Sequence, residues 1–374
     1  MTDAIVVGGG PAGAALATLL ARAGRDVVLF ERSAGPTDKV CGEFLSSEAV
    51  TYLDALGVDL ASLGAVPITA MRLCEGRHTS TMVLPFAASS LSRRVLDEAL
   101  LAKAASAGVC VRRGAKVRAL GRCGSAWHAR LDDGELVEAD AAFLATGKHD
   151  LHGRKRPEGL QSDLVAFKLH YRLSSEAAAA LAGHVELVLF DGGYAGLQMV
   201  EDGVANLCLL IRQQRLHALG HWDRVLAAIR SESAHLDARL LGAQPRWARP
   251  LAISAIPYGH VRQRSDGLWR LGDQAAVIPS FSGDGMSIAL HSAELAATTY
   301  LEGGPADAYQ RMLARDVTRQ VFFSTLLSQG LVRHAGQRAL GMAARAWPRL
   351  MSTVAFHTRV SDAALARAMP MRPN

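Results

Sequence analysis

The segment Gly8–Gly13, which reads GGGPAG, has the residue types and spacing of a loop that binds a pyrophosphate group. Gly8 permits a tight turn, Gly10 lets the backbone approach the phosphates, and Gly13 lets the following helix pack closely on a strand. The N-terminus of that helix would offer free N–H groups and a partial positive charge to the phosphates. The motif therefore predicts a dinucleotide site.

The elements around this segment support the prediction. An apolar run at 4–7 precedes it, an Ala/Leu-rich run with helical spacing follows at 14–25, and a second apolar run at 26–30 ends on Glu31. Strand, glycine turn, helix, strand and acidic residue form the context that makes the motif specific. The Glu31 carboxylate would accept hydrogen bonds from a ribose 2′-hydroxyl and would repel a 2′-phosphate, which argues against NADP in this first site.

A second candidate segment lies about 240 residues further along, where an apolar strand at 268–271 ends in Gly272-Asp273. The chain then passes Pro279 and the run Ser282–Met286, which reads SGDGM, into a helix expected at 287–300. A helix N-terminus at this point would stabilise negative charge on a bound group.

Three segments together resemble the FAD-dependent oxidoreductases of the para-hydroxybenzoate hydroxylase fold, which include aromatic monooxygenases, geranylgeranyl reductases and flavin halogenases. They are 8–31, the run 92–100 with the pattern Ser-Arg-x-x-Leu-Asp-x-x-Leu, and 272–289. The resemblance spans roughly the first 300 residues in the family's order, and it implies that the dinucleotide is FAD. The cofactor-binding residues that it implies are Gly8, Gly10, Pro11, Ala12, Gly13, Glu31, Arg32, Cys41, Arg93, Asp273, Pro279, Gly283, Asp284, Gly285 and Met286.

The same resemblance implies an α/β fold with a Rossmann-type FAD-binding domain, an inserted antiparallel-sheet substrate domain and a C-terminal helical region. We expect the discontinuous FAD-binding domain at 1–75, 92–160 and 262–305, and the substrate domain at 161–261 with about 76–91. Apolar runs at 164–171, 185–190 and 205–211 are typical of strands of the inserted sheet. A helical cap is expected over 306–374, with turns at Gly330, Gly336 and Pro348.

Composition excludes several other classes of protein. Hydrophobic residues make up 49% and charged residues 20%, and no apolar stretch approaches the roughly 18 residues of a membrane span. The five cysteines form no C-x-x-C pair, which indicates a reducing, cytoplasmic setting. No metal site is expected, because no His, Cys or Asp cluster has metal-ligand spacing, and no G-x-S-x-G motif marks a serine nucleophile.

Positive charge is concentrated in the C-terminal region. Residues 305–374 contain ten arginines against three aspartates, whereas the whole chain carries a net charge of +6. The region is rich in apolar residues at helical spacing, which favours amphipathic helices with arginine on the outer face. Such helices would form a solvated cap or a docking face for a membrane surface or an acidic carrier protein. Nucleic acid is not expected as a partner, because no aromatic-interleaved basic patch accompanies the charge.

The branch of the family is indicated by local departures from its motifs. Residues 39–43, which read KVCGE, resemble the Cys-Gly loop of the geranylgeranyl-reductase-like branch, and Asp284 lies between two glycines as in that branch. The Asp-Gly pair with which many hydroxylases handle NADPH is missing, since 145–150 read ATGKHD. The tryptophan motifs of the reductases and halogenases are missing too, because 194–199 read YAGLQM, and Gly196 should open the cavity above the flavin.

Two reactions and one non-catalytic role fit this sequence. The leading hypothesis is a monooxygenase of secondary metabolism that hydroxylates or epoxidises an apolar polyketide-, phenol- or terpenoid-like substrate through a flavin C4a-hydroperoxide. The alternative is a flavin-dependent reductase or dehydrogenase of carbon–carbon double bonds, with Cys41, His170 and Tyr194 as candidate proton donors. The third hypothesis is a redox-linked binding module. Electrons would come from NADH, NADPH or a partner reductase, and the substrate would arrive free or on a carrier.

Overall fold

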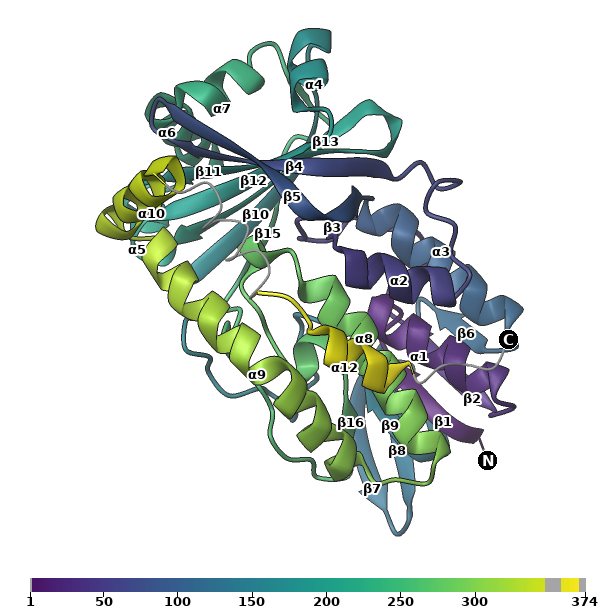
Figure 1. The fold of residues 1–374 in the computed structure, drawn as a ribbon. Coiled ribbons are helices and arrows are strands. Elements are labelled where there is room, and N and C mark those ends of the chain that lie inside the picture. The colour runs from purple at the N-terminus through teal and green to yellow at the C-terminus, as the bar shows by residue number, and fades with distance from the viewer. Residues whose placement is uncertain (1, 347–357, 370–374) are drawn as a thin grey trace.

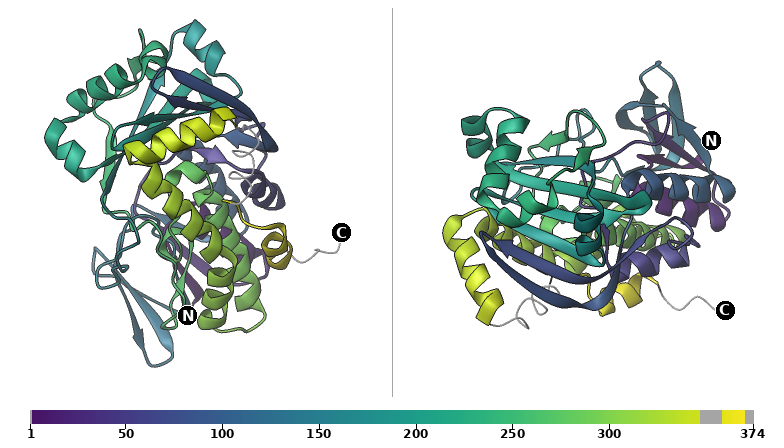
Figure 2. Two further views of the ribbon diagram at one scale, coloured as in Figure 1. Left: turned by 60° about the vertical axis from the view of Figure 1, so that its left-hand side comes forward. Right: turned by 90° about the horizontal axis from the view of Figure 1, so that it is seen from above.

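The computed structural model describes residues 2–346 and 358–369, and these form an α/β structure built on two sheets (Figure 1). The first sheet is formed mainly by the N-terminal part of the chain. The second sheet is formed mainly by the middle of the chain, and C-terminal helices run along one side of the molecule (Figure 2). The predicted α/β class with a Rossmann-type FAD domain is confirmed.

The first sheet has the parallel centre of a dinucleotide-binding unit. Its strand order is β6-β2-β1-β9-β8-β7, where β6, β2, β1 and β9 run parallel, β8 and β7 run antiparallel, and β16 pairs with β9. The predicted strands at 4–7 and 26–30 are β1 and β2. The strands are β1 (Thr2–Val7), β2 (Val27–Glu31), β6 (Cys110–Arg113), β7 (Val117–Cys123), β8 (Ala126–Leu131), β9 (Leu136–Leu144) and β16 (Trp269–Arg270).

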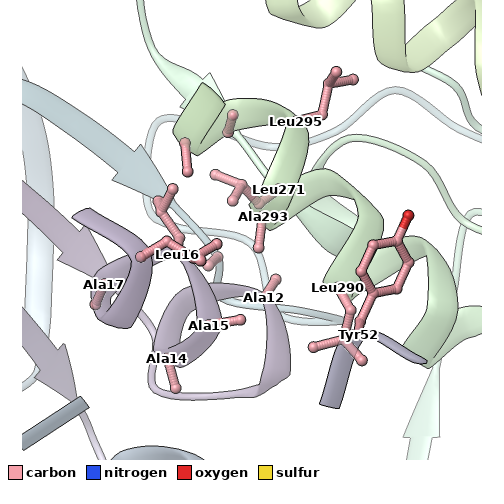
Figure 3. Packing of buried hydrophobic residues seen from close by; sticks show 14 of the residues in the cluster. Ala12, Ala14, Ala15, Leu16, Ala17, Tyr52, Leu271, Leu290, Ala293 and Leu295 are labelled. Atoms are coloured by element: carbon pink, nitrogen blue, oxygen red, sulfur yellow. The ribbon is translucent and has the colours of Figure 1, made fainter. Parts of the chain in front are cut away.

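Helices α1 (Pro11–Arg22) and α8 (Gly285–Leu301) pack against each other beside this sheet. Their buried alanine and leucine side chains belong to one hydrophobic cluster, which Tyr52 of α2 (Ser47–Ala55) also joins (Figure 3). Small side chains let the two helix backbones approach, and their first turns therefore converge on Gly272, where a Cβ would lie 3.4 Å from Ala12 Cβ. Helix α3 (Arg93–Ser106) also packs against α1.

The second sheet has the order β14-β10-β13-β12-β11-β4-β5-β3, and β15 pairs with β10. Four short helices, α4 (Ser175–Leu181), α5 (Gln213–Leu219), α6 (Trp222–Glu232) and α7 (Ala234–Arg239), accompany it. Its strands are β3 (Phe44–Leu45), β4 (Val66–Glu75), β5 (His78–Ser90), β10 (Leu164–Arg172), β11 (His184–Phe190), β12 (Gly193–Val200), β13 (Val204–Arg212), β14 (Gln244–Pro245) and β15 (Leu251–Ser254). The predicted strands at 164–171, 185–190 and 205–211 are β10, β11 and β13.

Two features of this sheet differ from the prediction. The pairing of β4 with β11 is parallel, whereas the other strand pairs of this sheet in the described residues are antiparallel. β4 also lies in the second sheet, although residues up to 75 were assigned to the FAD-binding domain. The reason is that β4 forms a hairpin with β5 and pairs with the distant strand β11. The division into domains otherwise stays a prediction.

The C-terminal helices connect the two halves of the molecule. α9 (Ala306–Leu331) contacts α8 and β16, α10 (His334–Ala346) contacts β4 and β5, and α12 (Asp362–Ala368) contacts α8. The predicted turn at Gly336 is wrong, because Gly336 lies in the first turn of α10. A Cβ there would lie 2.3 Å from the carbonyl oxygen of Gly330, so glycine permits close contact between the two helices. Pro348 lies outside the described residues. No helix in the described ranges has the length and apolarity required to span a bilayer.

Candidate functional site

A cleft of about 460 Å³ lies where the glycine segment, the loop at 38–44 and the start of α8 meet. It contains most of the residues that the sequence predicted to bind a cofactor, drawn from segments that are far apart in the chain. Those lining it are Gly8, Gly10, Pro11, Ala12, Glu31, Arg32, Cys41, Arg93, Asp273, Gly283, Gly285 and Met286. Three predicted residues, Gly13, Pro279 and Asp284, are absent from this lining.

Gly13 lies behind the wall of the cleft, where it allows α1 to pack closely on β1. Gly8 has a φ of +109°, and a Cβ on Gly13 would lie 1.9 Å from the Gly8 carbonyl oxygen, so only glycine lets α1 start this close to β1. The turn is fixed further by Glu31, whose carboxylate accepts the Gly9 N–H at 2.9 Å and the Ser33 N–H at 2.9 Å. Although burial raises the pKa of Glu31, nearby Lys39 and these hydrogen bonds hold it below the ordinary value.

Arg93 lies over the glycine turn, as expected for a residue that contacts phosphate. A Cβ on Gly10 would lie 3.2 Å from Arg93 Nη2. Asp97 orients the guanidinium by accepting from Nε at 2.7 Å and from Nη2 at 2.9 Å, and it also pairs with Lys39 at 2.9 Å. A positive group held beside the N-terminus of α1 suits a pyrophosphate. The residues of the cleft therefore fit FAD: Gly10 and Arg93 would hold its phosphates and Glu31 its ribose.

Arg156, a buried arginine that the sequence analysis did not identify, lies near Asp273 and is absent from the cleft lining. The Arg156 side chain is 2% exposed, and it donates to the carbonyl oxygens of Asp273 and Lys148 at 2.6 and 2.8 Å and to Asp150 at 2.6 Å. It thus ties the segment after β9 to the segment after β16. No local motif marks Arg156, because its partners lie far away in the sequence or within an irregular loop.

The turn before α8 brings Ser280 and Gly283 to the cleft. Gly283 has a φ of +75°, and a Cβ there would lie 2.6 Å from the Phe44 ring, so this position requires glycine. Pro279 lies between Ile278 and Ser280, which do line the cleft. Asp284 is fully buried and accepts a hydrogen bond from Ser287, while its Oδ2 has no hydrogen-bond partner among the described residues. Burial raises the pKa of Asp284 to about 7.

The loop at 38–44 is anchored by a buried charge network at Glu43. Glu43 has a φ of +60° and is 0% exposed. Its carboxylate pairs with Lys168, accepts the Arg93 backbone N–H at 2.8 Å and contacts His170 Nε2 at 2.8 Å. Burial favours the neutral carboxyl, but Lys168 and His170 lower the pKa of Glu43 below its ordinary value. The network therefore holds an ionised glutamate inside the protein.

Asp38 extends this network, because its carboxylate lies 3.9 Å from His170 Nδ1. Asp38, Glu43 and His170 offer ligand atoms within 4.8 Å of one another, although no sequence spacing indicated a cluster. The Lys168 ammonium already supplies positive charge to Glu43, so the arrangement has the composition of an ion-pair network rather than a metal site. His170, a candidate proton donor, lies in this network and is absent from the lining of the cleft.

The second sheet forms the floor beneath the loop in rows that cross β10, β13 and β12. The polar row is His170, Asn206 and Gln198, and the next row is Lys168, Cys208 and Gly196. From the polar row, Asn206 Nδ2 donates to the carbonyl oxygens of Cys41 and Gly42 at 3.1 and 2.9 Å. The apolar row is Ala166, Leu210 and Tyr194. One sheet face therefore changes from polar to apolar.

An apolar cavity of about 230 Å³ adjoins the cleft over β12 and β13, and its lining includes Gln198, Gly196, Cys208, Leu210 and Tyr194 from the three rows. The two spaces share Gly42, Phe44, Ser280 and Gly283. Gly196 faces open space, as its Cβ would meet only the Cys208 carbonyl oxygen, at 3.8 Å. The other lining residues are mostly apolar and include Met71, Met82, Leu84, Phe86, Leu187, Phe281, Leu326, Leu331 and Leu340.

The three candidate proton donors are thus in different surroundings. Cys41 lines the cleft, and its Sγ accepts the Glu43 backbone N–H at 3.3 Å. Burial lowers the pKa of the Arg93 guanidinium, but Asp97 and, to a smaller extent, Cys41 raise it above its usual range. Tyr194 lines the apolar cavity, where burial raises the pKa of its phenol. Cys41 directly precedes Gly42, which lines both spaces.

Comparison with known proteins supports the same cofactor. Residues 1–146 match the family described as the FAD binding domain. Menaquinone reductase of Mycolicibacterium smegmatis is 28% identical over 324 residues, covering 82% of this chain and 78% of that protein. Digeranylgeranylglycerophospholipid reductase 2 of Methanopyrus kandleri is 26% identical over 321 residues, covering 80% and 77%. The halogenase PltM in complex with phloroglucinol and FAD is 14% identical, with a TM-score of 0.76 over 99% of this chain and 90% of that chain, and shares the fold.

Proposed function

Because this chain is an FAD-dependent oxidoreductase of the para-hydroxybenzoate hydroxylase fold, we propose that it reduces a carbon–carbon double bond of an apolar lipid. This was the second hypothesis from the sequence. The observation that carries it is the apolar cavity, which adjoins the FAD cleft through Gly42, Phe44, Ser280 and Gly283. A substrate held there has its apolar part away from water and one end at the cleft.

The relatives favour reduction over oxygenation. The menaquinone reductase and the digeranylgeranylglycerophospholipid reductase align along about four-fifths of the chain, and both names describe reductases of lipids. The likeness to the halogenase PltM, at 14% identity, concerns the fold alone. The reductase proposal also agrees with the KVCGE loop, which resembles the geranylgeranyl-reductase-like branch.

The reaction requires one hydride and one proton, added to the two carbons of the double bond. Reduced FAD, when bound, supplies the hydride, and NADH, NADPH or a partner reductase supplies the electrons that reduce it again. The chain's own residues exclude water, align the double bond with the cleft and provide the proton. We assign the proton to the Cys41 thiol, because it lines the cleft beside Gly42 and is replenished from solvent through the cleft.

Oxygenation is the second candidate function, and the open space at Gly196 favours it. Without a large aromatic side chain, this part of the cavity has room for a ring system rather than only a narrow chain. Both reactions use the same cleft and cavity, so the fate of the electrons distinguishes them. In reduction the substrate gains two hydrogen atoms, whereas in oxygenation it gains one oxygen atom from O₂.

The test is to reduce the FAD-loaded protein without oxygen and then to add menaquinone or a digeranylgeranylglycerophospholipid in detergent. Reoxidation of the flavin under these conditions, with a product that remains heavier by two hydrogen atoms after any quinol has been reoxidised in air, is the expected result. Turnover that needs oxygen and gives a product with one added oxygen atom would establish the second candidate instead. Flavin that is reoxidised only by oxygen, with either lipid unchanged, would reject both lipids as substrates.

The role of Cys41 is tested with Cys41→Ser, compared with Cys110→Ser at an exposed cysteine outside the cleft lining. A serine hydroxyl is a much weaker acid than a thiol, so we expect C41S to slow anaerobic turnover by about 10²-fold or more. FAD content should stay at the wild-type level in both variants. The pH dependence of the rate provides the second readout, since a purely structural cysteine would leave it unchanged.

A further inference from the structure

We propose that the outer surface of α9 and α10 docks on an anionic lipid bilayer and admits the apolar substrate directly into the cavity. The surface is defined by Arg315, Arg319, Phe322 and Leu326 on α9 and by Arg338, Met342 and Arg345 on α10, and we call it the α9–α10 face. It does not depend on whether the reaction is reduction or oxygenation, since both need an apolar substrate.

Helical spacing places the α9 residues on one side of that helix. Arg315, Arg319, Phe322 and Leu326 follow one another at intervals of three or four residues and are all exposed. The opposite side of α9, with Leu313, Val317 and Val321, is buried in the core. α9 therefore has a fully packed inner side, and its outer side combines arginine with large apolar side chains.

The apolar members of the face are unusually open to solvent for their size. Phe322 is 59% exposed, Leu326 is 58% exposed, and Met342 on α10 is 58% exposed. Leu160, which is 57% exposed, lies beside α9 because its carbonyl oxygen accepts from Gln329 Nε2 at 3.1 Å. Four large apolar side chains on neighbouring segments make a patch of the kind that marks a contact surface.

The charges of the face fit an anionic surface. Arg315, Arg319 and Arg338 make no ion pair within the described ranges, 2–346 and 358–369, whereas Arg345 pairs with Glu75 at 3.1 Å. Three of the four arginines of the face therefore have no acidic partner among the described residues. Arginine beside exposed phenylalanine and leucine is the pattern of a helix that lies in a membrane interface. The apolar members would enter the acyl region while the guanidinium groups reach the head groups.

The apolar cavity opens onto the α9–α10 face. A bilayer docked on this face would therefore be a direct source of the apolar substrate. Leu326 is exposed and also lines the apolar cavity, together with Leu327, Leu331 and Leu340 of the same two helices. A lipid entering beside Leu326 would pass from one apolar environment into another without crossing water. An acidic carrier protein would be attracted by the arginines, but it would leave the apolar side chains of the face without a matching partner.

The experiment is flotation of the FAD-loaded, full-length protein with vesicles of phosphatidylcholine alone or mixed with phosphatidylglycerol. We expect binding to the mixed vesicles that weakens with salt, and little binding to phosphatidylcholine alone. The double variant R315Q/R319Q should bind the mixed vesicles about twenty-fivefold more weakly, since each arginine near the surface contributes about fivefold. The double variant F322S/L326S should lose vesicle binding, and a higher content of anionic lipid should not restore it.

Matched controls separate this face from general charge and hydrophobicity. R118Q changes an exposed arginine on β7, and L241S changes a leucine that is 69% exposed after α7. Both controls should bind vesicles as the wild type does, and all variants should keep wild-type FAD content and circular dichroism. Equal losses in controls and test variants would overturn the proposal. So would the absence of vesicle binding, and arginine-dependent binding to a purified acidic carrier protein would then identify the face as a protein-docking site.

Discussion

Replacing Lys168 with methionine should reveal how strongly the buried network holds the loop at 38–44. Lys168 and Glu43 are both fully buried, and the loop they anchor lines both the FAD cleft and the apolar cavity. Methionine keeps most of the side-chain volume and removes the charge. Breaking a buried pair costs about 3–5 kcal/mol because it leaves the other charge uncompensated. We expect K168M to lower the free energy of unfolding by about 3 kcal/mol, at the lower end of this range, because His170 and the Arg93 N–H still contact Glu43.

The loss should depend on pH in a defined direction. In the wild type, the pKa of Glu43 is lowered below 4.5, so Glu43 stabilises the fold above that pH, and this stabilisation is lost as the pH falls through the lowered value. In K168M, burial is no longer offset by the lysine, and the pKa should rise above 4.5. The penalty is then largest at neutral pH and decreases by up to about 1.4 kcal/mol per pH unit as protonation removes the buried charge.

Urea unfolding followed by circular dichroism, at neutral pH and at about pH 5, measures both effects. K155M, at an exposed lysine, is the matched control, and K168M/E43Q should recover part of the loss because no buried carboxylate remains. FAD affinity, measured by flavin fluorescence, should fall in K168M and not in K155M. The reasoning would be refuted if K168M lost no more than about 0.5 kcal/mol of unfolding free energy relative to K155M, or if its loss were the same at both pH values.

Two further substitutions test the buried aspartate and the cavity. Asp284→Asn should stabilise the protein more as the pH rises. The pKa of Asp284 is raised from 3.8 to about 7 in the folded protein, so the wild type loses stability as the pH rises between these two values. The gain in the free energy of unfolding should reach a few kcal/mol above about pH 7, and a gain that does not change with pH in urea unfolding would contradict this prediction. Gly196→Trp should abolish turnover and retain FAD, because the side chain would fill the apolar cavity, whereas Gly121→Trp on an exposed strand should leave turnover and flavin absorbance unchanged.

The parts of the site that one short segment forms could be predicted, because the residues that act together there are neighbours in the sequence. The segment Gly8–Gly13 acts through its own backbone, and the Cβ position of Gly13, 1.9 Å from Gly8 oxygen, explains why the motif is recognisable without a structure. Glu31 follows from the strand that ends there. The strands β1, β2, β10, β11 and β13 could also be predicted, because each is a short apolar run.

The parts formed by tertiary contacts could not be predicted in the same way. Glu43 and Lys168 are 125 residues apart, and nothing in either segment indicates that a loop and a strand meet there. Gly336 looked like a turn because glycine often ends a helix, but its function is to let α10 approach α9. His170 was a reasonable proton donor by residue type, yet its place in the register of β10 directs it to Glu43 instead.

One face of the second sheet lies beneath both the loop at 38–44 and the apolar cavity. Alternate residues of a strand share a face, so Ala166, Lys168 and His170 lie in line along β10, and the change from apolar to charged occurs within one strand. The charged end of β10 binds the loop that carries Cys41, whereas the cavity lies over the neighbouring strands β12 and β13, from which Tyr194 and Leu210 line it. A slip of one residue in the β10–β13 register would turn Lys168 away from Glu43, and a slip in the β12–β13 register would turn Tyr194 away from the cavity. The pairing of β13 with its two neighbours therefore sets the position of the loop that carries the proposed proton donor and of the apolar space next to it.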